Sequence, residues 1–469
     1  MTGAVRWSVP AYLALCIVLG GASAGGYGAN AALQLLAIVL LVLASLARPE
    51  PPPERAERVL LIGLGAMLVL ICLQFVPLPD TLWRSLPGRA EAVRPYQAAG
   101  IDLGQRFVSF IPHDSLKSAI WLLPAVGVLL AMMYARALFS GRNIAIALVA
   151  AMCLSVLVGA MQIASGTDSS LYFYHFTNRG TAVGFFANAN HMASLLLVTV
   201  PFQAALLRDG LNAEGSRRVA IIGAVSASFA VTICGIFVVG SLAGYGLLLP
   251  VTLASALIVR STRRMRLAAA VLLPVMVIAG LGLILATSDG QMMLNQASNL
   301  DQESRRLIFS TTWRALKHFW PVGTGLGTFQ EVYRSFENPL TIKLAYVNHA
   351  HDEYLEILLE TGVAGLVLLL AFLAWWIGRA WRVWREGSLS PFAMAAVIAS
   401  ASLMVHSLVD YPLRTAALSS VFAACLALMA APRRRAPSPE RDAVYGMEGG
   451  PGEPGTRGKG SRRRRRRSR

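Results

Sequence analysis

The stretch VNHAHDEYLEILLETGVAGLVLLLAFLAWW, residues 347–376, passes from two histidines and four acidic residues directly into a run of apolar side chains. About 20 apolar residues in a helix are needed to cross ~30 Å of hydrocarbon, and this run approaches that length. Backbone polar groups find no water inside a bilayer, so a segment that crosses it must be helical. The stretch therefore predicts a membrane-spanning helix whose entrance carries titratable side chains.

The composition of the whole chain extends this prediction. The 469 residues are 55% hydrophobic and only 14% charged, whereas soluble domains contain roughly a quarter charged residues. Similar apolar runs recur along the chain, and we predict about twelve spans. They are centred on residues 11–27, 30–47, 59–77, 117–138, 143–164, 189–207, 219–239, 242–259, 267–287, 361–378, 391–409 and 415–431. The predicted fold is an all-α polytopic membrane protein with a large helical loop between the ninth and tenth spans.

Basic residues indicate the orientation of these spans. Short loops that hold Lys or Arg tend to stay in the cytoplasm. If the N-terminus is cytoplasmic, the short arginine-containing loops all fall on the cytoplasmic side, and both termini lie there. The first apolar run is followed at once by a second, without a convincing cleavage site, so we predict a retained span rather than a signal peptide. The segments predicted to face outward are 78–116, 165–188 and 288–353.

Residues 432–469 differ in composition from the rest of the chain. They are rich in Gly, Pro and Arg, end in SRRRRRRSR and show no apolar periodicity, which is typical of disorder. We therefore predict one transmembrane domain, residues 1–431, followed by a disordered basic tail. An arginine run can bind nucleic acid, but on a tail tethered to a bilayer, attraction to anionic lipid headgroups is favoured. No nucleic-acid partner is expected.

The sequence predicts no metal site and no cofactor. The five cysteines lie inside apolar runs and lack the spacing of metal ligands or of a disulfide framework. The acidic groups DQE at 301–303 and HDE at 351–353 are not metal signatures. The glycine-rich segment GTGLG at 323–327 follows no strand, so it is not interpreted as a nucleotide-binding fingerprint. The chemistry is therefore expected to rely on side chains.

Polar groups gather where the outward segment 165–188 enters the next span. The sequence FTNRGTAVGFFANANHM places Arg179 shortly before that span and Asn188 and Asn190 at its first turn. Polar side chains near hydrocarbon are costly unless they face a cavity, which favours a binding role. In the structural alternative, Arg179 extends to lipid headgroups and Asn188 caps the helix. The residue types alone leave both interpretations open.

The largest outward segment, 288–353, holds a second cationic group. Residues 307–319, LIFSTTWRALKHF, have a pattern typical of an amphipathic helix at a membrane interface. Arginine recognises phosphate bidentately, so Arg305 and Arg306 beside a membrane-embedded groove suit a phosphorylated lipid. In the alternative, Arg306 and Arg314 form a solvated helix face paired with Glu303.

His351 is the strongest candidate for a chemical role. The unperturbed charge change of histidine lies near neutral pH, and neighbouring carboxylates can fix its tautomer, as a general base requires. Asp352 either orients His351 or caps the following helix. His349 is interpreted as incidental. Three acids share one face of that helix, namely Glu353, Glu356 and Glu360.

The last outward turn, HSLVDYPLRT at 406–415, adds further polar groups. His406 and Asp410 are four residues apart and share a helix face, and Arg414 follows at the boundary of the next span. Ionisable residues that face a bundle interior are candidates for function. A contact that joins two helices is the alternative.

Three of these elements together resemble the O-antigen ligase and O-antigen polymerase superfamily. Their order, spacing and predicted outward position agree with the family over roughly residues 120–430. The third element, a histidine followed by an acid and EYL, is the most specific. The elements are RGTAVGFFANANHMASLLL (179–197), SRRLIFSTTWRALKHFWPVGTGLGTFQEVY (304–333) and HAHDEYLEILLETGVAGLVLLL (349–370).

The resemblance implies a glycosyltransferase of the bacterial inner membrane. Such an enzyme transfers a glycan from an undecaprenyl-diphosphate carrier to a hydroxyl of a glycan, lipid A-core or protein acceptor, without a metal. By position, His351 matches the family's essential histidine, Arg179 the arginine before its G-x-F-x-N-x-N element, and Arg305 or Arg306 the arginine that opens its large loop. Further candidates for substrate binding are Asn188, Asn190, Asp352, Glu353 and Arg414.

These matches imply that the arginines hold the diphosphate and that His351 deprotonates the acceptor hydroxyl. A transporter of a lipid-linked glycan or a small anion is the alternative, with His351, His406 and Asp410 relaying protons. An apolar groove beside His351 would favour the enzyme. A pore between inverted repeats would favour the transporter, and the sequence shows no such repeat.

Overall fold

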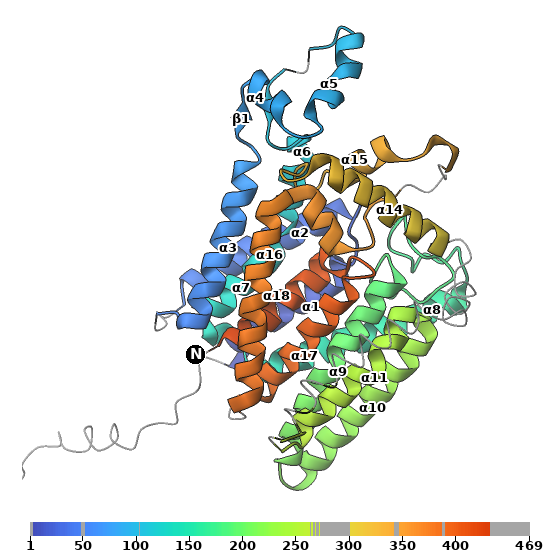
Figure 1. Cartoon of the computed structure of the whole chain (residues 1–469). Coiled ribbons are helices and arrows are strands. Elements are labelled where there is room, and N and C mark those ends of the chain that lie inside the picture. The colour runs from blue at the N-terminus through green and yellow to red at the C-terminus, as the bar shows by residue number, and fades with distance from the viewer. Residues whose placement is uncertain are drawn as a thin grey trace, which may run out of the picture. The chain divides into compact units, whose positions relative to one another are not determined.

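The computed structural model describes residues 3–47, 52–102, 104–262, 301–341, 347–386 and 390–431, with a few isolated positions between 264 and 272. The predicted ninth span, residues 267–287, and the predicted disordered tail, residues 432–469, lie outside the described residues. The regular structure of the described residues is helical apart from one pair of short strands (Figure 1).

The helices follow one another along the chain. Their bounds are α1 Ser8–Leu19, α2 Tyr27–Ser45, α3 Arg55–Leu73, α4 Asp80–Ser85, α5 Arg89–Ala98, α6 Pro112–Trp121, α7 Leu123–Tyr134, α8 Gly141–Ser165, α9 Ala189–Leu211, α10 Gly215–Val239, α11 Leu242–Val259, α14 Asp301–Phe319, α15 Phe329–Phe336, α16 Glu353–Glu386, α17 Pro391–His406 and α18 Ala416–Ala430. Short 3₁₀ helices are η1 Gly3–Trp7, η2 Arg136–Leu138, η3 Pro339–Thr341 and η4 Pro412–Arg414. Strands β1 Pro77–Leu78 and β2 Arg106–Phe107 pair antiparallel, with Pro77 opposite Phe107.

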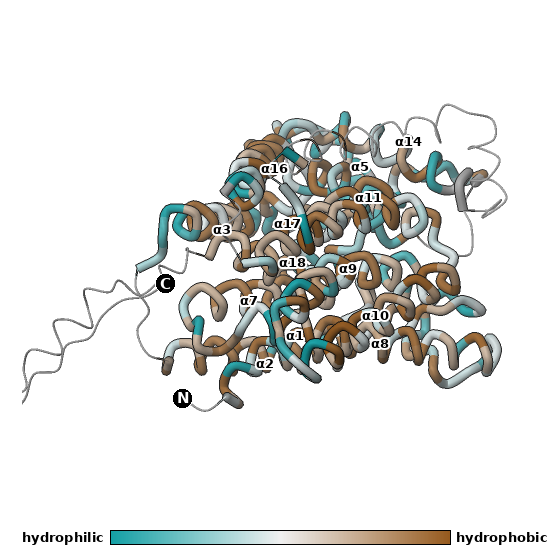
Figure 2. The backbone as a smooth tube through the Cα atoms, turned by 90° about the horizontal axis from the view of Figure 1, so that it is seen from below, coloured by the Kyte–Doolittle hydropathy of each residue, from teal (hydrophilic) through white to brown (hydrophobic). Residues whose placement is uncertain are grey.

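Eight of the described helical segments are long and apolar enough to cross a membrane. These are α2, α3, α6 with α7, α8, α9, α10, α11 and α16. Three shorter apolar segments, Gly3–Leu19, α17 and α18, overlap further predicted spans. Figure 2 shows apolar residues along most of these helices. The prediction of a helical, polytopic membrane protein is confirmed at this level.

The first span differs from its prediction. We predicted a span centred on residues 11–27, but the helix ends at Leu19. The segment GGASAGG follows, and Gly25 and Gly26 adopt positive φ angles of 82° and 62°. Glycine reaches this region of φ without steric cost, and it commonly stops helices for that reason.

Helix α9 lies at the centre of the bundle, where it packs against α10, α11 and α17. Helix α18 packs against α7 and α17, and α1 contacts both α8 and α18. Helix α16 lies further out and leaves Val367, Leu370 and Ile377 exposed. In a chain that crosses a bilayer, such apolar side chains face lipid. We call the end of the bundle covered by α4, α5, α14 and α15 the loop end (Figure 1).

The glycine-rich loop at 321–328 fixes the beginning of α16. Thr324 N donates to Leu359 O at 3.0 Å, and Gly325 N donates to Glu360 O at 2.8 Å. Helix α16 begins at Glu353, directly after the candidate cap Asp352, and its polar first turns precede the apolar span predicted at 361–378. The GTGLG segment therefore has a structural role, because its backbone N–H groups bind carbonyl groups of α16.

Gly362 interrupts α16 where this loop crosses it, with φ 59° and ψ −145°. A Cβ atom at this position would lie 2.1 Å from Pro321 O. A side chain is thus excluded both by the backbone conformation and by the close approach of the loop.

We predict that Gly362→Ala destabilises the protein. The strained backbone alone costs about 1–3 kcal/mol, and the clash with Pro321 adds to it. Gly378→Ala in the same helix is the matched control, because a Cβ there meets nothing within 4 Å. Its stability should change by at most about 1 kcal/mol. Thermal unfolding of both variants in the same detergent tests this, and equal melting temperatures would contradict the assignment.

Candidate functional site

Polar residues from three separate segments meet at the loop end, where α16 begins. His351 directly precedes α16, and Asp410 lies in the turn between α17 and η4. His191 belongs to the first turn of α9, and His406 is the last residue of α17. Asp410, His191 and His406 are almost completely buried. We call these four residues the histidine cluster.

His351 has two features of a functional residue. Its φ is 53°, the left-handed region, and it is the one non-glycine residue of the described chain with a positive φ. Such strain persists only when surrounding contacts impose it, and it concentrates at functional sites. Its Nδ1 lies 3.3 Å from Asp410 Oδ1, and its side chain is 22% exposed. The opposite ring nitrogen, Nε2, therefore points away from the carboxylate.

Asp410 supplies the negative charge of the cluster. Its Oδ1 accepts a hydrogen bond from Tyr411 N at 2.9 Å and lies 4.0 Å from His191 Nε2. Burial by itself raises the pKa of Asp410, but the close approach of His351 and the neighbouring imidazoles outweigh it, so the pKa is lowered from its usual value. Asp410 is thus ionised at neutral pH and can fix the tautomer of His351.

Several buried polar atoms of the cluster have no hydrogen-bond partner within the described residues. They are both ring nitrogens of His191, Nδ1 of His351, Nε2 of His406 and Oδ2 of Asp410. The other nitrogen of His406, Nδ1, lies 2.7 Å from Ser194 Oγ. Buried polar groups are nearly always paired, and the exceptions include redox and catalytic groups. Although three histidines and an acid gather here, the described residues contain no group arranged to hold a metal ion.

A buried ion network lies behind the cluster. Arg414 Nη2 lies 3.3 Å from Glu356 Oε1 and 3.1 Å from Glu360 Oε2. Glu356 Oε1 also lies 2.8 Å from His349 Nδ1, and Gly327 N donates to Glu360 Oε1 at 2.8 Å. Burial by itself lowers the pKa of Arg414, but the carboxylates outweigh it and raise the pKa. The network therefore joins η4, α16, the glycine loop and the residues just before His351.

Asp352 and Glu353 make contacts within the protein. Asp352 Oδ1 accepts a hydrogen bond from Leu355 N at 3.0 Å, which caps α16, and burial raises the pKa of this carboxyl. Glu353 accepts hydrogen bonds from Ser407 Oγ and from Leu413 N, each at 2.7 Å. The structure thus brings both residues to the site but uses their oxygens to fix α16 against the last outward turn.

The two predicted asparagines also lie at the site. Asn188 caps α9 by accepting from Asn190 N at 2.8 Å, and its side chain lies near Tyr411. Asn190 Oδ1 accepts a hydrogen bond from Ser241 Oγ at 2.8 Å. These contacts join the beginnings of α9 and α11 to the turn that carries Asp410.

The predicted arginines differ in their surroundings. Arg179 is exposed, donates to Thr167 O at 2.8 Å and lies 5.5 Å from the ring centre of Tyr172. Arg305 on α14 is half-buried and close enough to His406 to act on it electrostatically. Arg306 is exposed.

Tyr411 is central to the site, yet sequence reasoning missed it. Its ring centre lies 4.9 Å from that of His351, 5.0 Å from that of His191 and 4.5 Å from that of His349. His349, interpreted as incidental, is part of the site through this contact and through Glu356. The position of Tyr411 next to Asp410 in HSLVDYPLRT was the one signal in the sequence that could have identified this residue. Its contacts with the histidines join segments that are far apart in the chain.

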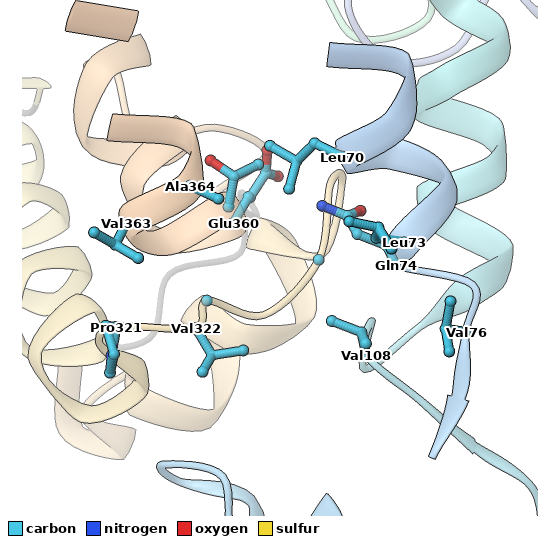
Figure 3. Close-up of a pocket in the computed structure, with 13 residues that line it drawn as sticks. Leu70, Leu73, Gln74, Val76, Val108, Pro321, Val322, Glu360, Val363 and Ala364 are labelled. Atoms are coloured by element: carbon cyan, nitrogen blue, oxygen red, sulfur yellow. The ribbon is translucent and has the colours of Figure 1, made fainter. Parts of the chain in front are cut away.

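An apolar cavity of about 390 Å³ adjoins the ion network. Figure 3 shows Leu70 and Leu73 of α3, and Gln74 just after it, across from Glu360 and Ala364 of α16. The glycine-rich loop at 321–328 forms one side of the cavity. Its remaining lining residues are Val76, Val108, Pro321, Val322, Gly323, Gly325, Thr361 and Val363. Glu360 thus lines the cavity and also holds Arg414.

We predict that Arg414→Met strongly destabilises the fold, since it leaves Glu356 and Glu360 buried without their cation. Breaking a buried ion pair in this way costs about 3–5 kcal/mol. Arg179→Met, which removes an exposed arginine, should leave stability unchanged within about 0.5 kcal/mol. Thermal unfolding in detergent measures both. If Arg414→Met and the wild type have the same melting temperature, the network does not stabilise the fold.

Comparison with known proteins agrees with this geometry. Residues 227–370 match the family model described as O-antigen ligase. No curated protein matches the chain. The matched segment includes α14, the glycine loop, His351 and the first half of α16. The resemblance to the O-antigen ligase and polymerase superfamily seen in the sequence is therefore confirmed over this segment.

Proposed function

We propose that the protein transfers a glycan from an undecaprenyl-diphosphate carrier to an acceptor hydroxyl at the periplasmic face of the bacterial inner membrane. The match of residues 227–370 to the O-antigen ligase family model supports glycan transfer in general. The observation that carries the specific proposal is the strained backbone of His351, whose ring lies beside the buried carboxylate of Asp410. In this proposal both termini are cytoplasmic and the loop end faces the periplasm. The acceptor is a glycan, lipid A-core or protein.

In the proposed reaction, His351 Nε2 takes the proton of the acceptor hydroxyl. The acceptor oxygen then bonds to the anomeric carbon of the glycan, while the bond from that carbon to the carrier diphosphate breaks. The electron pair of the broken bond leaves with the diphosphate, and His351 later releases its proton to water. Asp410 stabilises the imidazolium that forms. No step of this scheme uses a metal.

The leaving diphosphate needs positive charge. We assign this role to Arg305, which acts electrostatically on His406, and to Arg306 and Arg179. Arg179 follows Asn178, whose side chain accepts a hydrogen bond from Ala189 N at the beginning of α9. This contact holds the segment with Arg179 against the beginning of α9. Asn188 lies at the same helix end, near Tyr411. Arginines placed in this way stabilise the charge that develops on the leaving group.

The remaining candidates take supporting roles in the proposal. The charge of Arg414 is matched by two buried carboxylates, so we assign it to positioning rather than to diphosphate binding. Asp352 and Glu353 hold the beginning of α16 and thereby His351. Asn188 and Asn190 line the same end of α9 and are proposed to contact the substrate.

The apolar cavity beside Glu360 supports a lipid-linked substrate over transport of a small anion. It is lined almost entirely by apolar side chains, and Glu360 and Arg414 connect it to the residues just before His351. A donor that carries a diphosphate on a hydrocarbon chain requires an apolar surface next to charged groups.

We predict that His351→Ala abolishes measurable glycan transfer, because general-base catalysis contributes about 10²–10⁴ in rate. His175→Ala is the control, since this exposed histidine lies outside the cluster and should retain transfer. The assay uses purified protein, a lipid-diphosphate glycan and candidate acceptors, and follows loss of the donor. Wild-type rates in His351→Ala would refute the base assignment. Solute passage into proteoliposomes without donor consumption by the wild type would support transport instead.

We predict that Asp410→Asn lowers kcat by about 10²–10⁴ while KM for the donor stays near its wild-type value. The variant preserves size but removes the charge that orients His351 and stabilises its protonated form. Circular dichroism and melting temperature verify that the variant is folded. A change confined to KM would assign Asp410 to substrate binding instead.

A further inference from the structure

A second cavity, of about 440 Å³, lies between α2 and α6 and shares no lining residue with the histidine cluster or with the apolar cavity. Tyr27, Asn30 and Gln34 line it from one face of α2, at helical spacing. The lining residues of α6 also follow one stripe of that helix. They are His113, Leu116, Lys117, Ile120 and Trp121.

The polar groups of this cavity have unused hydrogen-bonding capacity. Lys117 Nζ donates to the Tyr27 hydroxyl at 3.2 Å and lies 4.8 Å from the centre of its ring. Lys117 has no carboxylate partner within the described residues, although an ammonium group carries three donors. The side chains of Gln34 and His113 likewise form no hydrogen bond within the described part of the chain.

The apolar groups lie on the same surface. Leu116 and Ile120 are exposed, and Trp121 is half-exposed. Both helices belong to segments that are apolar enough to cross a membrane, and the cavity includes the first turn of α2. Trp, Tyr and Lys at the end of a span are typical of the headgroup level of a bilayer. A ligand here thus meets a cation and amide groups at one side and apolar side chains at the other.

We propose that this cavity binds the phosphate headgroup of an anionic phospholipid, with Lys117 on the phosphate and with Leu116 and Ile120 against the beginning of the acyl chains. One cation near the bilayer surface enriches an anionic lipid by about fivefold. Gln34, His113 and Asn30 supply neutral groups for the glycerol hydroxyls of such a headgroup. The site does not depend on the proposed transfer reaction.

Quenching of Trp121 by brominated lipids tests the proposal. The protein is placed in nanodiscs that contain brominated phosphatidylglycerol or, at the same mole fraction, brominated phosphatidylcholine. The chain has nine tryptophans, so the signal of Trp121 is the difference between the wild type and Trp121→Phe. We expect a preference of about fivefold for phosphatidylglycerol. Equal quenching by the two lipids would overturn the proposal.

Variants identify the group responsible. Lys117→Gln should abolish the preference, and Lys117→Arg should retain it because the charge is kept. Lys317→Gln, which removes an exposed lysine of α14, is the matched control and should behave like the wild type. A preference that survives Lys117→Gln would refute the role of this residue. Competition by glycerol 1-phosphate added in solution would show that a soluble phosphate, rather than a lipid, is the ligand.

Discussion

The fold of the site depends on the buried ion network in which Arg414 faces Glu356 and Glu360. Charges removed from water are stable only when each finds partners of opposite sign and good geometry. Here one guanidinium serves two carboxylates from successive turns of α16, and His349 and Gly327 N complete their hydrogen bonds. None of these groups can move alone without leaving a buried charge unmatched.

This requirement explains why His351 is held in a strained conformation. The residue lies between His349, which is bound to Glu356, and the α16 cap formed by Asp352. With both sides fixed, the backbone of His351 adopts the left-handed region, and its ring meets Asp410. The energetic cost is balanced by the surrounding contacts, as is usual where a side chain must be aimed at a reactant.

The site combines a stable framework with unsatisfied groups. Glu353, Asp352 and Arg414 have partners within the protein, whereas His191 and Asp410 retain buried polar atoms without partners in the described residues. The contacts of Glu353, Asp352 and Arg414 fix the beginning of α16, and we propose that His191 and Asp410 take part in the chemistry of the site. Catalysis by preorganised groups requires both, because a side chain that must be reoriented during reaction stabilises the transition state less.

The sequence by itself determined the helical membrane architecture, the loop-end location of the polar segments and His351 as the candidate base. Apolar run length and motif order are local properties, so they can be read without contacts. Only the tertiary structure decided that Asp410 and Tyr411 meet His351, that His349 belongs to the site and that Arg414 is matched by acids. These contacts join segments far apart in the chain, and helix packing, rather than any local pattern, brings them together.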